Sequence, residues 1–131
     1  MKRKEIINTK NAPVAVGPYS QAVRVGEMVF TSGQLGINPL NNQLVEGIEN
    51  QTRQALKNIE NILEATNSLL DNAIKVTVFL RDMNNFSKMN EIYGEYFTKN
   101  PPARSCVEVS KLPKDAEIEI EVMATVYEKN E

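Results

Sequence analysis

The sequence predicts a single α+β domain in which two helices pack on one face of a mixed β-sheet. Three observations lead to this prediction. Two stretches carry apolar residues at three- and four-residue steps, several shorter stretches alternate with a period of two, and turn-forming residues separate them. With 131 residues, the chain is long enough for one domain with a sizeable core. We therefore expect residues 1–131 to form one domain.

The first half of the chain predicts a hairpin, a loop and a helix. Residues 21–32, QAVRVGEMVFTS, contain two β-rich runs around Gly26-Glu27, which is typical of a tight turn. Residues 33–47 are rich in Gly, Asn and Pro, which predicts a loop. A helix is expected near residues 47–67, because one face recurs at helical spacing. That face comprises Ile48, Thr52, Ala55, Leu56, Ile59, Ile62, Leu63 and Thr66.

The second half predicts a strand, a helix and two further strands. Residues 73–80, AIKVTVFL, alternate as a strand does. Residues 84–98 carry aromatic and apolar residues at helical spacing, with Asn84 or Asn85 as the N-cap. Residues 102–109, PARSCVEV, are interpreted as a strand, and so are residues 117–127. The last strand carries Ile118, Ile120, Val122, Ala124 and Val126 on one face and Glu117, Glu119 and Glu121 on the other.

The sheet face away from the helices also carries apolar residues. Examples are Met28, Phe30, Phe79, Met123 and Tyr127. No further helix is predicted that could cover them, and large exposed apolar patches are rare in monomers. A partner subunit is therefore the expected cover of this face.

Composition excludes several classes of function. Lysine and arginine total 15 against 17 acidic residues, so the net charge of -2 gives no reason to expect binding to nucleic acid or to a membrane. No signal peptide or transmembrane segment is recognisable, and a single cysteine cannot form an internal disulfide. A cytoplasmic protein is expected.

The absence of histidine is the most informative count. It removes Ser-His-Asp and Cys-His nucleophile systems, histidine zinc sites and histidine general bases. No glycine-rich phosphate loop occurs, and one cysteine cannot build a multi-cysteine metal site. We expect no metal or cofactor, so that any chemistry uses carboxylates, arginine, lysine, hydroxyls, one thiol, backbone groups or water.

The stretch PARSCVEV contains the first candidate site residues. Arg104 and Cys106 share one strand face, and Glu119 lies on the non-core face of the last strand. In a cleft against another subunit, Arg104 and a glutamate could bind an anion and position water. Spacing alone favours a cross-strand ion pair instead. Cys106 alone is interpreted as a small strand hydrophobe.

Two further candidates lie in the first third of the chain. Gly17-Pro18 predicts a rigid turn that could present Tyr19 to a pocket, although a tyrosine packed at a sheet edge with its hydroxyl in water is the simpler interpretation. Ser32-Gly33 ends a predicted strand. Glycine there permits close backbone approach to a ligand, and equally permits an ordinary turn. These residues alone predict an oligomeric α+β domain and leave its function open.

Six blocks of the sequence resemble the Rid family, also called YjgF or RidA, the reactive-intermediate deaminases. The blocks are GPYSQAV, TSGQLG, QTRQALKNIENILEA, KVTVFLRDMNNF, NEIYGEYF and PPARSCVEVSKLPKDAEIEIEVMA, and they follow in the family order from about Asn11 to Thr125. The resemblance implies a chorismate-mutase-like fold. It also implies a homotrimer with a barrel-like sheet core and three active-site clefts between subunits.

The resemblance further implies an activity without cofactor. The family hydrolyses 2-imino acids, such as 2-iminobutanoate and 2-iminopropanoate, to 2-oxo acids and ammonia. These imines form from enamines released by pyridoxal-phosphate-dependent threonine and serine dehydratases. By resemblance, Arg104 binds the substrate carboxylate and Glu119 polarises the attacking water. The residues implied to line the cleft are Tyr19, Ser32, Gly33, Asn90 and the backbone of Cys106.

Two alternative functions stay open at this point. One is a non-catalytic trimer that binds small carboxylates, or has a regulatory or chaperone-like role. The other is a ribonuclease or translation inhibitor. The acidic balance and the absence of histidine argue against a nuclease with a histidine acid-base pair.

Overall fold

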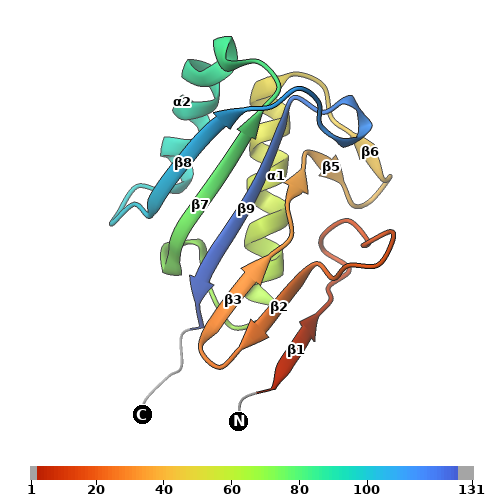
Figure 1. Ribbon diagram of the computed structural model, residues 1–131, viewed down its shortest axis with the longest axis vertical. Helices are drawn as coiled ribbons and strands as arrows, with labels where there is room; N and C mark the ends of the chain where they lie inside the picture. Colours follow the sequence, from red (N-terminus) through yellow and green to blue (C-terminus); the bar gives the residue numbers. More distant parts are fainter. Residues whose placement is uncertain (1–2, 127–131) are drawn as a thin grey trace.

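The computed structural model describes residues 3–126, and most of its strands form one mixed sheet (Figure 1). The sheet order is β1-β2-β3-β9-β7-β8, with β4 also paired to β9. Only β7 and β8 are parallel to each other. The bounds are β1 Lys4–Ile7, β2 Ala22–Val25, β3 Met28–Thr31, β4 Gln34–Leu35, β7 Ala73–Leu80, β8 Ala103–Glu108 and β9 Ile118–Thr125. The predicted α+β class and mixed sheet are therefore confirmed.

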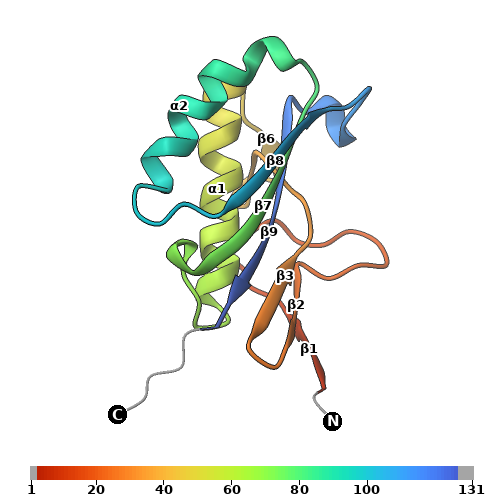
Figure 2. The same ribbon diagram turned by 60° about the vertical axis from the view of Figure 1, so that its left-hand side comes forward.

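Two helices cover one face of this sheet (Figure 2). Helix α1 spans Ile48–Glu64 and helix α2 spans Phe86–Tyr96. Helix α1 ends earlier than predicted because Asn67 adopts a left-handed φ of 63°, and the N–H groups of Thr66 and Ser68 both donate to the Leu63 carbonyl. Neither helix is long and apolar enough to cross a membrane.

The start of α2 differs from its predicted capping. A short 3₁₀ turn, Met83–Asn85, precedes the helix, and the Asp82 carboxylate accepts the Asn84 N–H at 2.9 Å. Asn85 occupies the N-cap position, but its side chain makes no capping bond. Its amide donates instead to Glu117 Oε1 at 3.2 Å.

Residues 33–47 contain three very short strands where the sequence predicts a loop. They are β4, β5 Ile37–Asn38 and β6 Gln43–Leu44. A strand of two residues is too short to show an alternation of apolar and polar residues. The loop was therefore predicted from the Gly, Asn and Pro content of the segment alone. The amide of the buried Asn58 on α1 donates to the carbonyls of Leu35 and Ile37, which fixes this segment against the helix.

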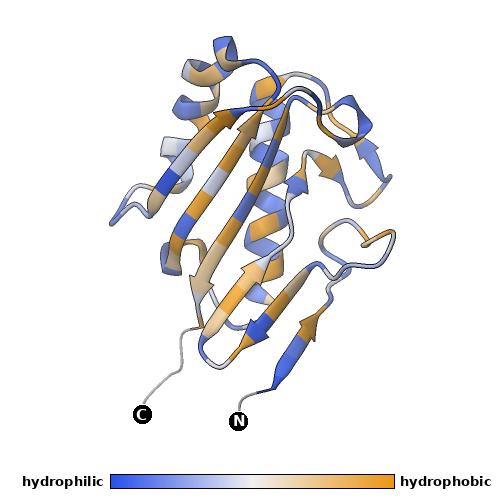
Figure 3. Cartoon of the chain, in the orientation of Figure 1, coloured by the Kyte–Doolittle hydropathy of each residue, from blue (hydrophilic) through white to orange (hydrophobic). Residues whose placement is uncertain are grey.

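The core lies between the helices and the sheet. Strands β7 and β9 show the expected alternation of apolar and polar residues (Figure 3). All five apolar residues predicted for one face of the last strand are buried, as are Leu56, Ile59, Ile62 and Leu63 of α1. The predicted end of the last strand, Tyr127, lies outside the described residues.

The opposite face of the sheet is open. It exposes Phe30 (41%), Met123 (38%) and Val107 (43%), and the register places Phe30 directly beside Met123. Ile6 and Val25 extend this apolar surface onto the outer strands. Neither helix covers these side chains, as the sequence predicted.

Candidate active site

A cleft of about 590 Å³ opens beside the start of β9. Its walls come from the loop that precedes β2, from the β3–β4 segment and from the turn at residues 113–114. Four of the predicted site residues line it: Tyr19, Ser32, Gly33 and Glu119. We call these four residues the cleft group.

A bulge in the sheet places Ser32 and Gly33 in the cleft. Strand β3 pairs with β9 up to Phe30 and Met123, and pairing resumes in β4 between Gln34 and Ile120. Between these pairs, residues 31–33 oppose residues 121–122, which is one residue too many for a regular ladder. The Thr31 hydroxyl accepts the Val122 N–H at 3.0 Å and so replaces a backbone acceptor.

Gly33 lets the Glu119 side chain lie against the backbone. A Cβ atom built on Gly33 would stand 2.6 Å from Oε2 and 2.7 Å from Cδ of Glu119, closer than atoms can pack. The sequence left two roles open for this glycine. The group that lies close to the Gly33 backbone is the Glu119 carboxylate of the same chain.

The surroundings of Glu119 make its carboxylate a better base than an exposed one. Burial raises the pKa of Glu119, and the like charge of Glu121 raises this pKa further. A half-buried carboxylate with a raised pKa can hold a water molecule and accept its proton.

Replacing Glu119 with glutamine is expected to stabilise the fold at neutral pH. Because the pKa of Glu119 is higher in the folded state, the folded protein binds more protons than the unfolded chain between the two pKa values. The free energy of unfolding of the wild type therefore falls as pH rises through that window. Glutamine does not titrate, so Glu119→Gln does not lose stability in this way. Melting curves should place Glu119→Gln above wild type at pH 7 and level with it below pH of about 4.

Glu91→Gln is the matched control, since Glu91 is exposed on α2. It should leave the melting temperature unchanged at both pH values. A Glu119→Gln protein that melts below wild type at pH 7 would mean that the carboxylate makes stabilising contacts which outweigh its burial.

The loop before β2 presents Tyr19 to the cleft. Gly17 has a φ of 122°, and its carbonyl accepts the Tyr19 N–H at 2.9 Å, which closes a tight turn. The Tyr19 ring is 52% exposed, and its hydroxyl accepts the Val16 N–H at 3.4 Å. Tyr19 lies on this loop and lines the cleft, which is the placement that the first of the two interpretations expects.

Gln21 fixes this loop, and the sequence analysis did not single it out. Its buried amide accepts the Thr9 N–H at 2.7 Å and donates to the carbonyls of Thr9 and Pro13. The Ser32 hydroxyl donates to the Ser20 carbonyl and ties the loop to the bulge. The sequence contained one signal for this role, because Gln21 directly precedes the apolar residues Ala22 and Val23 of a predicted strand. A glutamine that is buried there needs hydrogen-bond partners for its amide.

Arg104 lies elsewhere, on the helix-covered face of β8. Its Nη1 donates to Asn90 Oδ1 at 2.7 Å, and its guanidinium carbon stands 4.6 Å from the ring centre of Tyr93 and 5.5 Å from that of Phe86. These partners occupy one face of α2 because they are spaced by three and four residues. The two aromatic rings orient the guanidinium by cation–π contact.

Cys106 follows Arg104 on the same strand face. It is partly buried against the core. Burial raises the pKa of the Cys106 thiol, and the positive charge of Arg104 offsets part of this rise. A raised pKa keeps the thiol protonated and unreactive, in agreement with the interpretation of Cys106 as a strand hydrophobe. We call Asn90, Arg104 and Cys106 the arginine group.

The predicted cross-strand ion pair between Arg104 and a glutamate was wrong. Strand β7 lies between β8 and β9. Arg104 is in register with Val76, which is buried under the helices, whereas Glu119 is in register with Phe79 on the open face. Two strand spacings and three residue steps separate them, about 10 Å in each direction, with the sheet in between.

One chain therefore holds the predicted site in two parts. The cleft group supplies a carboxylate and hydroxyls, and the arginine group supplies an oriented cation. Because they lie on opposite sides of the sheet, they cannot meet within a single chain. Among residues 3–126, no group of three or more acidic or cysteine side chains is placed to hold a metal ion.

Comparison with known proteins identifies the family. Residues 9–126 match the family model described as Endoribonuclease L-PSP. The chain is 56% identical to a RutC family protein of Pyrococcus horikoshii, over 92% of this chain and 97% of the relative. It is 46% identical to the 2-iminobutanoate/2-iminopropanoate deaminase of Salmonella typhimurium, over 90% and 94%. The solved structure of YyfA from Yersinia pestis, a protein of the conserved Rid family, has 51% identity and a TM-score of 0.91, over 95% and 100%. The chain thus belongs to the Rid family, also called YjgF or L-PSP.

Proposed function

We propose that this protein hydrolyses small 2-imino acids to 2-oxo acids and ammonia, at a site completed between two subunits of a homotrimer. The observation that carries the proposal is the division of the site into two groups. The cleft group has a carboxylate but no arginine, and the arginine group has an oriented guanidinium but no carboxylate. The exposed apolar face of the sheet favours a subunit contact, which would bring the two groups together. The deaminase name of a relative with 46% identity supports the reaction class.

Arg104 is proposed to bind the substrate carboxylate. One guanidinium nitrogen is already held by Asn90, and the rings of Phe86 and Tyr93 fix its plane. Among the described residues, no carboxylate pairs with this guanidinium. Its remaining N–H groups can therefore take a carboxylate in a two-pronged contact, which a lysine could not reproduce.

Glu119 is proposed to handle the water. The carboxylate orients a water molecule toward the imine carbon and accepts a proton as the oxygen adds. The resulting carbinolamine carries the hydroxyl and the amine on one carbon. When the imine enters protonated, Glu119 returns the proton to the amine nitrogen of the carbinolamine and takes the hydroxyl proton as ammonia leaves and the C=O bond forms. Imines add water readily, so a site that orients the water and the imine and supplies one group to carry protons is sufficient to accelerate the reaction.

Release of 2-oxobutanoate from threonine by a purified threonine dehydratase tests the proposal. The dehydratase product passes through the enamine and imine, so added protein should shorten the lag before the 2-oxo acid appears. Scavenging the imine with a trapping amine should enlarge the difference. Equal time courses with and without the protein, at several dehydratase concentrations, would contradict the activity. Saturable binding of 2-oxobutanoate in that case would favour a small-carboxylate-binding role.

A further inference from the structure

The turn between β8 and β9 has an unfavourable backbone. Within Pro113–Asp115, Lys114 has φ 57° and ψ 22°, and Asp115 has φ 59°. Two successive left-handed residues with side chains are uncommon, because the Cβ atom crowds the backbone there. Such a conformation persists only where neighbouring structure holds it, and it then often serves a site.

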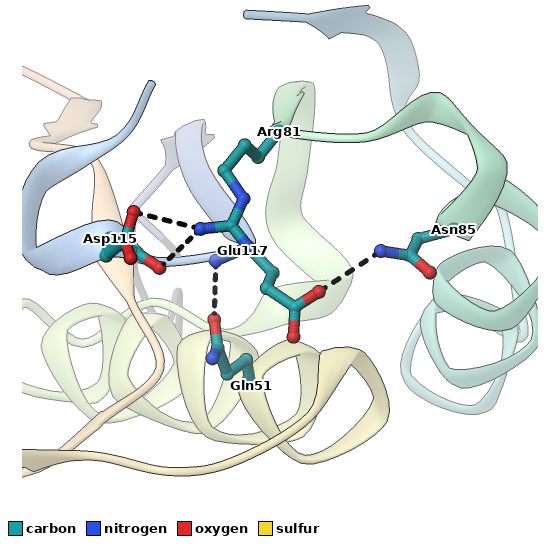
Figure 4. A network of polar contacts seen from close by, with 5 residues as sticks. All are labelled: Gln51, Arg81, Asn85, Asp115 and Glu117. Atoms are coloured by element: carbon teal, nitrogen blue, oxygen red, sulfur yellow. Dashed lines mark hydrogen bonds and ion pairs between the residues drawn. The ribbon is translucent and has the colours of Figure 1, made fainter. Parts of the chain in front are cut away.

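Polar contacts hold this turn from several directions (Figure 4). Arg81, at the end of β7, donates through Nη1 to the backbone and side-chain oxygens of Asp115, both at 3.0 Å. Gln51 of α1 accepts the Glu117 N–H at 2.8 Å, and Asn85 donates to the Glu117 carboxylate. Side chains from α1, from the residue after β7 and from the N-cap of α2 therefore fix the chain just before Glu119.

The fixed turn places Lys114 in the wall of the cleft. Lys114 lines the same cleft as Glu119 and Tyr19 and is the one cationic residue among its described lining residues. The described residues give its ammonium no carboxylate partner. The lining of the cleft also includes apolar side chains, among them Val14, Leu35 and Ile37. A strained turn thus brings an unpaired cation to a cleft whose single acid is Glu119.

We propose that Lys114 is a specificity-determining residue that binds a second, distal carboxylate, so that the cleft accepts 2-imino dicarboxylic acids. This inference rests on the proposed function, in which Arg104 of a neighbouring subunit takes the carboxylate next to the imine. That assignment leaves Lys114 without a role toward a monocarboxylic substrate. A side chain of one or two methylene groups that ends in a carboxylate would complement both the apolar wall and the ammonium.

The test compares two imines made in the assay by amino acid oxidases. One is the imine of 2-aminobutanoate and the other is the imine of glutamate, and semicarbazide trapping reports the imine that remains. The ratio of kcat/KM for the dicarboxylic imine to kcat/KM for the neutral imine is measured for wild type, Lys114→Gln and Lys114→Arg. Lys111→Gln is the matched control, since Lys111 is exposed nearby and does not line the cleft.

Lys114→Gln should lower the ratio by about tenfold, and Lys114→Arg should restore most of it. The wild-type ratio should also fall as salt concentration rises, because a partly exposed ion pair is screened. Lys111→Gln should leave the ratio as in wild type. An unchanged ratio in Lys114→Gln, while the neutral imine is hydrolysed, would overturn this inference alone. Hydrolysis of neither imine by wild type would overturn the proposed function and this inference with it.

Discussion

Arg104→Ala is expected to lower kcat/KM for 2-iminobutanoate by about a hundredfold or more, since it removes the proposed anchor of the substrate carboxylate. Arg104→Lys should recover only a small part, because a lysine keeps the charge but lacks the planar fork that lies over the rings of Phe86 and Tyr93. The measurement is 2-oxobutanoate release in the dehydratase assay, with the trapping amine present.

Arg53→Ala provides the control for this variant. Arg53 pairs with Glu95 on the exposed surface of the helices, away from both halves of the site. Its loss should change activity by less than twofold and leave the melting temperature close to that of wild type. An Arg104→Ala protein that folds and retains full activity would remove Arg104 from the mechanism.

Gly33→Ala is expected to lower activity by about a hundredfold while the protein stays folded. The added Cβ would overlap the Glu119 carboxylate, so this side chain must leave the position from which it is proposed to orient the water. A displacement of about 1 Å at a reacting group can cost this much. Gly33 has an ordinary φ, so alanine does not strain the backbone there.

Gly94→Ala separates this effect from a general effect of adding a methyl group. Gly94 lies in α2, and a Cβ on it would meet nothing within 4 Å. Alanine favours a helix over glycine, so Gly94→Ala should be slightly more stable and fully active. Circular dichroism and melting curves establish the fold of both variants. Full activity in a folded Gly33→Ala would show that the position of Glu119 against Gly33 is not needed.

Periodicity predicted the regular elements well. Strand β7 has the predicted bounds, 73–80, because eight alternating residues give a clear signal. The strands of the hairpin at residues 21–32 and the last strand also occur close to where they were predicted. Helix ends were less accurate, because Asn67 adopts a left-handed conformation that a sequence permits but does not require.

The site was harder to predict because it depends on tertiary geometry. Spacing suggested that Arg104 and Glu119 face each other, but the insertion of β7 between their strands depends on sheet order. The contact of Gly33 with Glu119 requires a bulge whose extra residue is invisible to alternation. Lys114 escaped notice because nothing local marks a lysine as left-handed.

The motifs, in contrast, identified the family directly. The family model covers residues 9–126, close to the span over which the blocks were recognised. The family model is described as an endoribonuclease, whereas the relatives are named RutC family protein and imine deaminase. A family description alone therefore does not decide the reaction, and the residues of the site must be tested.

Mixing two variants that are each expected to be inactive tests the proposed shared site most directly. Arg104→Ala keeps the cleft group and Glu119→Gln keeps the arginine group, so each can complete the other only across a subunit contact. The two proteins are unfolded together at equal concentration, refolded, and assayed for 2-oxobutanoate release beside each variant refolded alone. If subunits assemble at random, about one quarter of the sites regain both groups, and about a quarter of wild-type activity should return. Mixed oligomers, verified by mass spectrometry, that stay as inactive as either parent would contradict a site shared between subunits.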